Sequence, residues 1–372
     1  MKIITGKHNI ARVFSDTLDD ATREQILTFV SHPAFAGKPI AIMPDCHAGK
    51  GACIGFTMPL NDYVIPNIVG VDIGCGMLAT CYGQMEIDPK AIDAVVHERI
   101  PCGFGINQMP IGYDDSFTCR EVCRRIGIDA DKALKGCGSL GGGNHFIEFD
   151  RDSSGNVWSV IHSGSRNFGL KVANFYHRKA VENMGKYFVE AKDGIGFIPD
   201  SSDDYEGYLW AMKVAQKFAT ASRSEMEARL RESLHLTAVD QFESIHNFIG
   251  EDGIIRKGAT SAKEGERCLI PFNSVDGTAI CVGKGNPSWN YSAPHGAGRR
   301  MSRTKAKEVL SLDAMRGMFA DKGVYTSTAD KNTLDESPEA YKPMSEILEQ
   351  IKETVDVIII LKPFYNFKAS GE

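Results

Sequence analysis

Residues 67–77 read Asn-Ile-Val-Gly-Val-Asp-Ile-Gly-Cys-Gly-Met, an apolar run that carries one carboxylate and one thiol between three glycines. The pattern predicts a buried strand entering a tight turn, because glycine permits a positive φ and a close approach of the backbone. Asp72 and Cys75 are a hard and a soft metal ligand, held three residues apart. Taken alone, the stretch fits a core strand with a buried thiol better than it fits a metal site.

The composition predicts a soluble globular protein. The chain has 372 residues, of which 42% are hydrophobic and 24% charged, enough for one large domain or two ordinary ones. The N-terminus has no apolar core of signal-peptide length, and the longest apolar run, 355–361, is too short to cross a bilayer. Ten cysteines without a signal predict reduced thiols in the cytoplasm. With a net charge of −6, any contact with nucleic acid must be local.

Apolar periodicity and turn residues predict a mixed α/β chain. Helices are expected over residues 16–30, 87–100, 168–188, 205–236, 303–320 and 345–354. Strands are expected over residues 39–43, 52–59, 77–82, 146–149, 157–162, 268–272, 278–282 and 355–361. Residues 193–204, between the two long helices, are interpreted as a mobile lid or a plain connector. No linker or repeat divides the chain, so one domain over residues 1–372 is expected.

Three histidines stand beside glycine, serine or asparagine at the ends of predicted strands or apolar segments: His145, His162 and His246. The turn at 152–155 predicts a hairpin that brings the first two to neighbouring strand ends. With Asp72 and Cys75 they form a set of ligands larger than one four-coordinate ion needs, which fits two ions that share the thiolate. A lone histidine in such a position is more often a hydrogen-bonded structural residue.

His295 has different surroundings, since small residues and then Arg299, Arg300 and Arg303 follow it. Small residues with a local arginine cluster are typical of phosphate binding, and they favour His295 as a nucleophile rather than a ligand. Ser163-Gly-Ser-Arg166 repeats the combination. Surface turns with solvated arginines would explain either piece about equally well. The sequence contains neither a dinucleotide-binding fingerprint nor a P-loop.

Five motifs, in order along the chain, resemble the RtcB family of RNA ligases. They are Val-Gly-Val-Asp-Ile-Gly-Cys-Gly-Met (69–77), Gly-Gly-Asn-His-Phe-Ile-Glu (142–148), His-Ser-Gly-Ser-Arg (162–166), Lys-Gly-Ala (257–259) and His-Gly-Ala-Gly-Arg-Arg-Met-Ser-Arg (295–303). Pro-Glu-Ala-Tyr-Lys-Pro (338–343) fits the C-terminal part of that family. The resemblance implies a compact α/β domain with a β-sandwich-like core flanked by helices. Because the chain is shorter than many relatives, we expect a branch used in RNA repair rather than in tRNA splicing.

The resemblance also implies an activity and its residues. In that family, manganese and GTP drive the joining of RNA 3′-phosphate or 2′,3′-cyclic phosphate ends to 5′-hydroxyl ends. Relatives often use an archease-type activator. His295 would take GMP. Two manganese ions, bridged by Cys75, would be held by Asp72, Cys75, His145, His162 and His246. Guanylate contacts would be made by Asn144, Phe146, Glu148, Ser274, His295, Gly296, Ala297, Tyr341 and Lys368. RNA phosphates would meet Arg166, Arg299 and Arg303.

Two roles are inferred from chemistry. A nucleophilic histidine needs its second nitrogen held, usually by a carboxylate, so Asp45 in the Pro-Asp-Cys-His loop is hypothesised to orient His295. A plain Asx turn would explain Asp45 equally well.

Phe146 and Glu148 would share one face of a strand, where a ring and a carboxylate could receive guanine through its N1–H and N2–H donors. The alternative is that Glu148 is an exposed strand residue.

Other functions fit parts of this pattern. An end-capping guanylyltransferase on DNA or RNA 3′-phosphates would stop after GMP transfer, and a metallophosphoesterase would use the same ions without a covalent histidine. A catalytically silent RNA-binding relative is disfavoured, because His295 and the full ligand set are intact. Thiolate and imidazole ligands also suit zinc or cobalt, so manganese rests on the resemblance.

Overall fold

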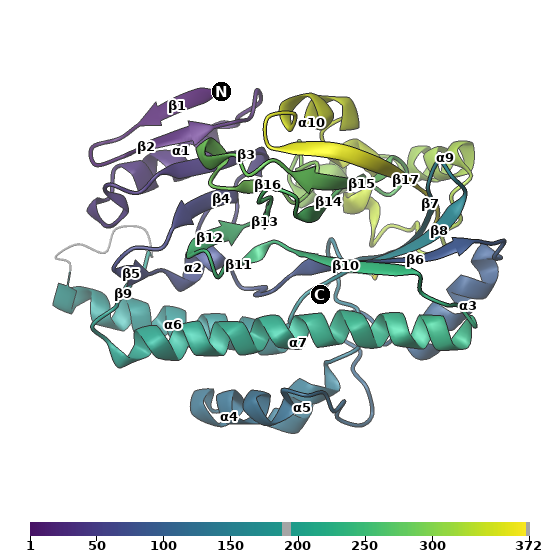
Figure 1. The fold of residues 1–372 in the computed structure, drawn as a ribbon, viewed down its shortest axis with the longest axis horizontal. Helices are drawn as coiled ribbons and strands as arrows, with labels where there is room; N and C mark the ends of the chain where they lie inside the picture. The colour runs from purple at the N-terminus through teal and green to yellow at the C-terminus, as the bar shows by residue number, and fades with distance from the viewer. Residues whose placement is uncertain (188–194, 370–372) are drawn as a thin grey trace.

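Seven antiparallel strands form the larger of the two main sheets (Figure 1). The computed structural model describes residues 1–187 and 195–369. The strand order in this sheet is β10-β6-β8-β7-β17-β15-β14. The strands are β6 (Gly76–Gln84), β7 (Phe146–Arg151), β8 (Asn156–Ser163), β10 (Asp240–Ile245), β14 (Arg267–Asn273), β15 (Gly277–Gly283) and β17 (Val355–Phe367).

A second sheet has six strands in the order β1-β2-β3-β4-β12-β11, and only β2 and β3 in it run parallel. Its strands are β1 (Lys2–Thr5), β2 (Ile10–Val13), β3 (Ile40–His47), β4 (Ile54–Pro59), β11 (Asn247–Ile249) and β12 (Ile254–Lys257). Two short pairs complete the sheets: β13 (Ala259–Ser261) with β16 (Ser292–Pro294), and β5 (Tyr63–Val64) with β9 (Ile198–Pro199). The predicted mixed α/β fold with a β-sandwich-like core is therefore confirmed.

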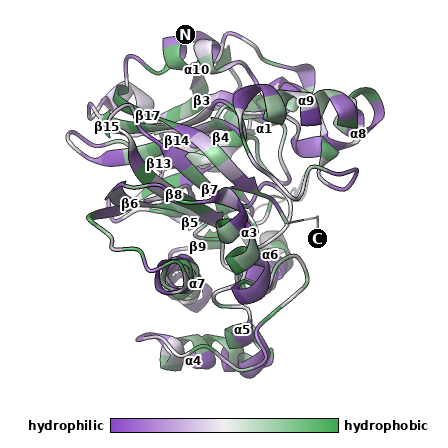
Figure 2. Cartoon of the chain, turned by 90° about the vertical axis from the view of Figure 1, so that its right-hand side faces the viewer, coloured by the Kyte–Doolittle hydropathy of each residue, from purple (hydrophilic) through white to green (hydrophobic). Residues whose placement is uncertain are grey.

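The helices lie outside the strands. They are α1 (Asp20–Val30), α2 (Pro66–Val69), α3 (Pro89–Arg99), α4 (Ser116–Ile126), α5 (Ala130–Lys135), α6 (Arg166–Tyr187), α7 (Asp203–Ser233), α8 (Arg303–Val309), α9 (Leu312–Lys322) and α10 (Met344–Gln350). Figure 2 shows the layers from the side, with α6 and α7 beneath the strands and α4 and α5 outermost. Each predicted helix and strand outside 67–77 and 303–320 is present, with ends that differ by a few residues.

The longest helix, α7, shows why these segments fold as they do. Ser202 caps its N-terminus by accepting a hydrogen bond from the Asp204 amide, and acidic residues in the first turn favour the helix dipole. Tyr208, Met212 and Ala215, which are spaced by three or four residues, are fully buried against the core. Among the described residues, no helix is both long enough and apolar enough to span a membrane.

The strand predicted over 67–77 is wrong. Pro66 begins the helical turn α2, because its fixed φ suits the first position of a helix. Gly70, with φ of 96°, ends that turn, and the chain continues as a loop until β6 begins at Gly76. The two candidate ligands of this stretch therefore lie on a loop.

Two other segments differ from expectation. The helix predicted over 303–320 is broken into α8 and α9, because Leu310 is extended and Ser311 caps the second helix through the Ala314 amide. Of the lid or connector predicted at 193–204, residues 193 and 194 lie outside the described residues. Ile198–Pro199 pairs as β9 with β5.

Candidate active site

Strand pairing brings the five predicted metal ligands together. His145 directly precedes β7, and the pairing of β7 with β8 sets Phe146 opposite His162, so the predicted hairpin is confirmed. His246 follows β10, which pairs with β6, and its amide donates a hydrogen bond to the carbonyl of Cys75 at 2.9 Å. Asp72 lies on the loop before β6. Segments far apart in the sequence thus meet at the ends of neighbouring strands.

The ligand atoms of these residues form one cluster. Cys75 Sγ lies 3.3 Å from Nε2 of both His145 and His162. His145 Nε2 is 3.0 Å from Asp72 Oδ2, and His162 Nε2 is 3.2 Å from His246 Nε2. The atoms divide into two groups that share Cys75, and within each group they lie within 4.8 Å of one another. This arrangement offers donors to two cations with a common thiolate.

The electrostatics of the cluster fit metal binding. Burial lowers the pKa of His162 and of His246 well below the ordinary value, and neighbouring imidazoles act in the same direction, so both rings are neutral. Burial favours a higher pKa for Asp72, but its contacts with His145 outweigh this and hold the pKa below the ordinary value. Burial and Asp72 raise the pKa of the Cys75 thiol, so a cation must displace its proton.

Backbone contacts hold the ligand loops. The Ser165 amide donates to Asp72 Oδ1 at 3.1 Å, and a Cβ on Gly164 would lie 2.0 Å from that oxygen, so only glycine fits there. The buried guanidinium of Arg223, on α7, donates to the carbonyls of Gly74 and Ser163, next to two ligands. Sequence reasoning missed Arg223; its signal was a charged residue on the apolar face of a helix.

His295 follows β16 and faces Asp45. Its Nδ1 lies 2.6 Å from Asp45 Oδ2, and the Asp45 side chain is fully buried. Gly298, with φ of 74°, packs so closely that a Cβ there would lie 2.2 Å from the Asp45 carbonyl oxygen. β3 continues to His47, so Asp45 lies on a strand and the predicted loop is wrong. The geometry leaves Nε2 of His295 as the nitrogen available to a second group.

A cavity of about 280 Å³ lies beside His295. All the residues that the resemblance implies for guanylate border it: Asn144, Phe146, Glu148, Ser274, His295, Gly296, Ala297, Tyr341 and Lys368. The other residues that border it include His162 of the ligand cluster and His47. A single chamber therefore joins the candidate nucleophile to the candidate metal ligands.

One part of this cavity is lined by side chains of β7 and by Asn366 of β17. Glu148 is only 2% exposed, so the alternative of an exposed strand residue is wrong. Its Oε2 accepts a hydrogen bond of 2.7 Å from Asn366 Nδ2. Burial raises the pKa of Glu148 to about 7, although Asn366 acts in the opposite direction. The Lys368 ammonium lies 5.4 Å from the centre of the Phe146 ring.

Glu336 organises the cationic side of the same cavity, and sequence reasoning did not select it. It accepts hydrogen bonds from Lys368 at 2.8 Å, from Arg299 at 3.2 Å, and from Arg303 and the Tyr341 hydroxyl. Burial would raise its pKa, but Lys368, Arg303 and Arg299 outweigh burial and hold the pKa of Glu336 at about 2. The sequence signal that could have identified Glu336 is its position just before the motif at 338–343.

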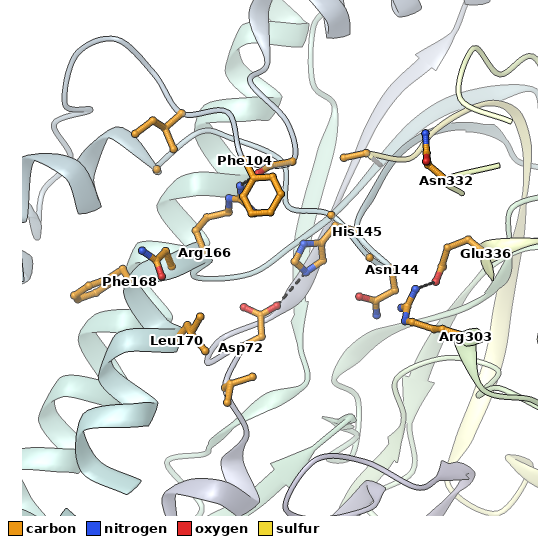
Figure 3. A pocket seen from close by; sticks show the side chains of 18 of the residues that line it. Asp72, Phe104, Asn144, His145, Arg166, Phe168, Leu170, Arg303, Asn332 and Glu336 are labelled. Atoms are coloured by element: carbon orange, nitrogen blue, oxygen red, sulfur yellow. Dashed lines mark hydrogen bonds and ion pairs between the residues drawn. The ribbon is translucent and has the colours of Figure 1, made fainter. Parts of the chain in front are cut away.

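A larger cleft of about 1300 Å³ opens on the other side of the ligand cluster (Figure 3). Asp72, His145 and Arg166 border it, and so does Phe104, whose side chain is 83% exposed. Arg303 borders both the cleft and the smaller cavity, as does Asn144, whereas Arg299 borders only the cavity. The arginines predicted to meet RNA phosphates therefore line the two hollows around the ligands.

Comparison with known proteins gives consistent matches. The family model described as tRNA-splicing ligase RtcB matches residues 25–126 and 124–369. RNA-splicing ligase RtcB1 of Escherichia coli is 30% identical over 383 residues, covering 91% of this chain and 92% of that protein. tRNA-splicing ligase RtcB of Aeropyrum pernix is 30% identical over 407 residues, covering 83% of each. RNA-splicing ligase RtcB of Mycobacterium tuberculosis is 29% identical, covering 82% of this chain and 91% of that protein.

Proposed function

This chain belongs to the RtcB family of RNA ligases, and we propose that it uses GTP and manganese to join RNA 3′-phosphate or 2′,3′-cyclic phosphate ends to 5′-hydroxyl ends in RNA repair or tRNA splicing. One observation carries the proposal. His295, held by Asp45 at 2.6 Å, borders a cavity together with every residue implied for guanylate. The free thiols of all ten cysteines suit a reducing compartment such as the cytoplasm.

His295 acts first. Its Nε2 attacks the α-phosphorus of GTP, forming an N–P bond while the bond to pyrophosphate breaks and pyrophosphate leaves with the bonding electrons. Asp45 accepts the Nδ1–H, which keeps the lone pair on Nε2 and offsets the positive charge that the ring gains. Arg299 borders the cavity and would supply positive charge toward the phosphates.

The RNA end then receives GMP. An oxygen of the 3′-phosphate attacks the phosphorus held by His295, and the imidazole leaves. The 5′-hydroxyl attacks the activated 3′-phosphate, forming a phosphodiester and releasing GMP. Arg166 and Arg303 border the larger cleft and would hold RNA phosphates, since guanidinium groups bind phosphate oxygens in pairs. Asn144 borders both the cleft and the cavity, so the two RNA ends would meet where these hollows adjoin.

Manganese would be held by the five clustered residues, with Cys75 shared between two ions. Bound divalent cations supply charge neutralisation at the phosphates. The donor set of thiolate, imidazole and carboxylate fits such cations, and the neutral state of His162 and His246 leaves their lone pairs available.

Labelling with α-labelled GTP tests this function. Wild-type protein should take up an acid-labile label, and His295→Ala should lose it while keeping its metal, because no ligand is removed. His97→Ala is the matched control, since His97 lies on α3 and bonds Ser327. A metallophosphoesterase would take no label, and an end-capping enzyme would take label and cap RNA without joining it. Undiminished labelling of His295→Ala would overturn the assignment of the nucleophile.

A further inference from the structure

Two buried carboxyl groups lie next to each other on β7. Glu148 and Asp150 are two residues apart on one strand, so their side chains lie on the same face of the sheet. Glu148 is 2% exposed and Asp150 is fully buried. Glu148 accepts a hydrogen bond from Asn366, but among the described residues no N–H or other donor group is bonded to either carboxyl oxygen of Asp150. A buried ionised carboxylate without a donor is strongly unfavourable, so Asp150 requires an explanation.

The neighbours of Asp150 on the two flanking strands cannot supply a donor. On β17 its register partner is Pro363, which has no backbone N–H. On β8 its register partner is Trp158, whose indole N–H donates to Asp152 at 3.1 Å. The titratable group that acts on Asp150 is Glu148.

The charged groups around Glu148 and Asp150 determine which of the two carboxyl groups carries a proton. Lys368 is the cation that acts on Glu148, and its ammonium is paired with Glu336 at 2.8 Å. Two adjacent carboxyl groups in a buried site resist ionising together, so the pair keeps one proton even above neutral pH. Burial and the neighbouring Glu148 raise the pKa of Asp150 well above its ordinary value, whereas Glu148 has a pKa of about 7. The proton therefore resides on Asp150.

We propose that Asp150 is a positioning residue for base selection, which as a neutral acid donates a hydrogen bond to the Glu148 carboxylate and holds it ionised toward the nucleotide cavity. The inference rests on the proposed function, in which Glu148 meets the edge of guanine. An ionised Glu148 accepts from the N1–H and N2–H of guanine, whereas a protonated Glu148 can donate to N1 of adenine. Holding Glu148 ionised therefore favours GTP over ATP.

Two variants of Asp150 separate this role from a structural one. Asp150→Asn keeps an N–H donor beside Glu148, whereas Asp150→Leu removes the donor at similar volume. The measurement is the ratio of single-turnover labelling rates with α-labelled GTP and ATP, from about pH 6 to about pH 9. Asp150→Asn should keep the wild-type preference at neutral pH. At neutral pH, the GTP:ATP rate ratio of Asp150→Leu should be about tenfold lower than that of the wild type. The ratio should recover as the pH rises, because Glu148 without its donor stays protonated to a higher pH.

Infrared spectroscopy locates the proton without a nucleotide. At about pH 8.5 the wild type and Glu148→Gln should show the band of a protonated buried carboxyl, and Asp150→Asn should lack it. Asp152→Asn is the control for stability, because Asp152 accepts hydrogen bonds from Asn156 and Trp158 at the end of the same hairpin. It should lower the melting temperature and leave the GTP:ATP profile unchanged.

The possible failures are distinct. Absence of label from GTP in the wild type would overturn the proposed function and, with it, the role in base selection. A wild type that prefers GTP, with an Asp150→Leu ratio that matches it at every pH, would overturn the inference alone. So would a wild type that lacks the protonated carboxyl band.

Discussion

Replacing Asp45 by asparagine would remove the charge that holds Nδ1 of His295 and leave the shape of the side chain. Asp45 is fully buried, and within the described part of the chain its Oδ1 has no hydrogen-bond partner, so its carboxylate interacts mainly through the 2.6 Å contact of Oδ2 with His295. An asparagine amide would donate to Nδ1 instead of accepting from it. The imidazole would then carry its proton on Nε2, where the lone pair is needed for attack on phosphorus.

The size of the effect follows from the strength of this contact. A hydrogen bond to a charged group contributes about 1.5–3 kcal/mol, and about 1.4 kcal/mol corresponds to a tenfold change in rate. Loss of the contact alone should therefore slow guanylylation by about tenfold to 150-fold. Because the wrong tautomer would also be stabilised, the loss should approach the roughly 10⁴-fold seen for the same change in a Ser-His-Asp triad.

Single-turnover labelling with α-labelled GTP measures this rate directly. Metal content should stay at the wild-type level, because Asp45 is not one of the clustered ligands. Asp93→Asn is the matched control: Asp93 is 9% exposed and accepts hydrogen bonds from Ser327 and Tyr365, away from the cavity. It should alter the melting temperature without slowing the labelling.

A labelling rate within about twofold of the wild type would refute the reasoning, because even the weakest estimate is about tenfold. A slow Asp45→Asn variant that had also lost its metal would refute it as well. In that case Asp45 would support the ligand cluster and not the orientation of His295.

Three further predictions concern the ligands and the cavity. Cys75→Ala should lower the bound metal at both positions, as measured by elemental analysis, whereas Cys81→Ala should retain it, because only Cys75 belongs to both ligand groups. Glu336 has a pKa of about 2 against an ordinary 4.5, so it contributes about 3 kcal/mol that is present above pH ~4.5 and lost as the pH falls toward ~2. Glu336→Gln should therefore lower the melting temperature at neutral pH, and the melting temperature of this variant should fall less than that of the wild type on acidification. An equal fall in the two proteins would contradict this prediction. Glu148→Gln should narrow the ratio of GTP to ATP labelling by about tenfold or more with metal content intact, and an unchanged ratio would mean that Glu148 does not read the base.

The sequence alone selected most of the side chains that meet at the candidate site, although it missed Arg223 and Glu336. Metal binding and phosphate chemistry require particular side chains on tight backbone, so Asp72, Cys75 and the glycines around them were recognisable before any fold was known. The hairpin that joins His145 to His162 was also predictable, because a short turn between two strands sets their register locally. Local signals misled where one residue changed the backbone: Pro66 began a helical turn in place of a strand, and Ser311 divided a helix.

Only the tertiary structure decided which of these residues meet. Asp45 and His295 are 250 positions apart, and nothing local to either indicates the other. Glu336 binds cationic side chains from three separate segments, and Arg223 on α7 donates to carbonyl groups next to two candidate ligands. Strand pairing also places Asp150 between Pro363 and Trp158, neither of which has a donor to spare for its carboxyl group. Such contacts depend on burial and on the packing of distant strands, which hydrophobic periodicity does not encode.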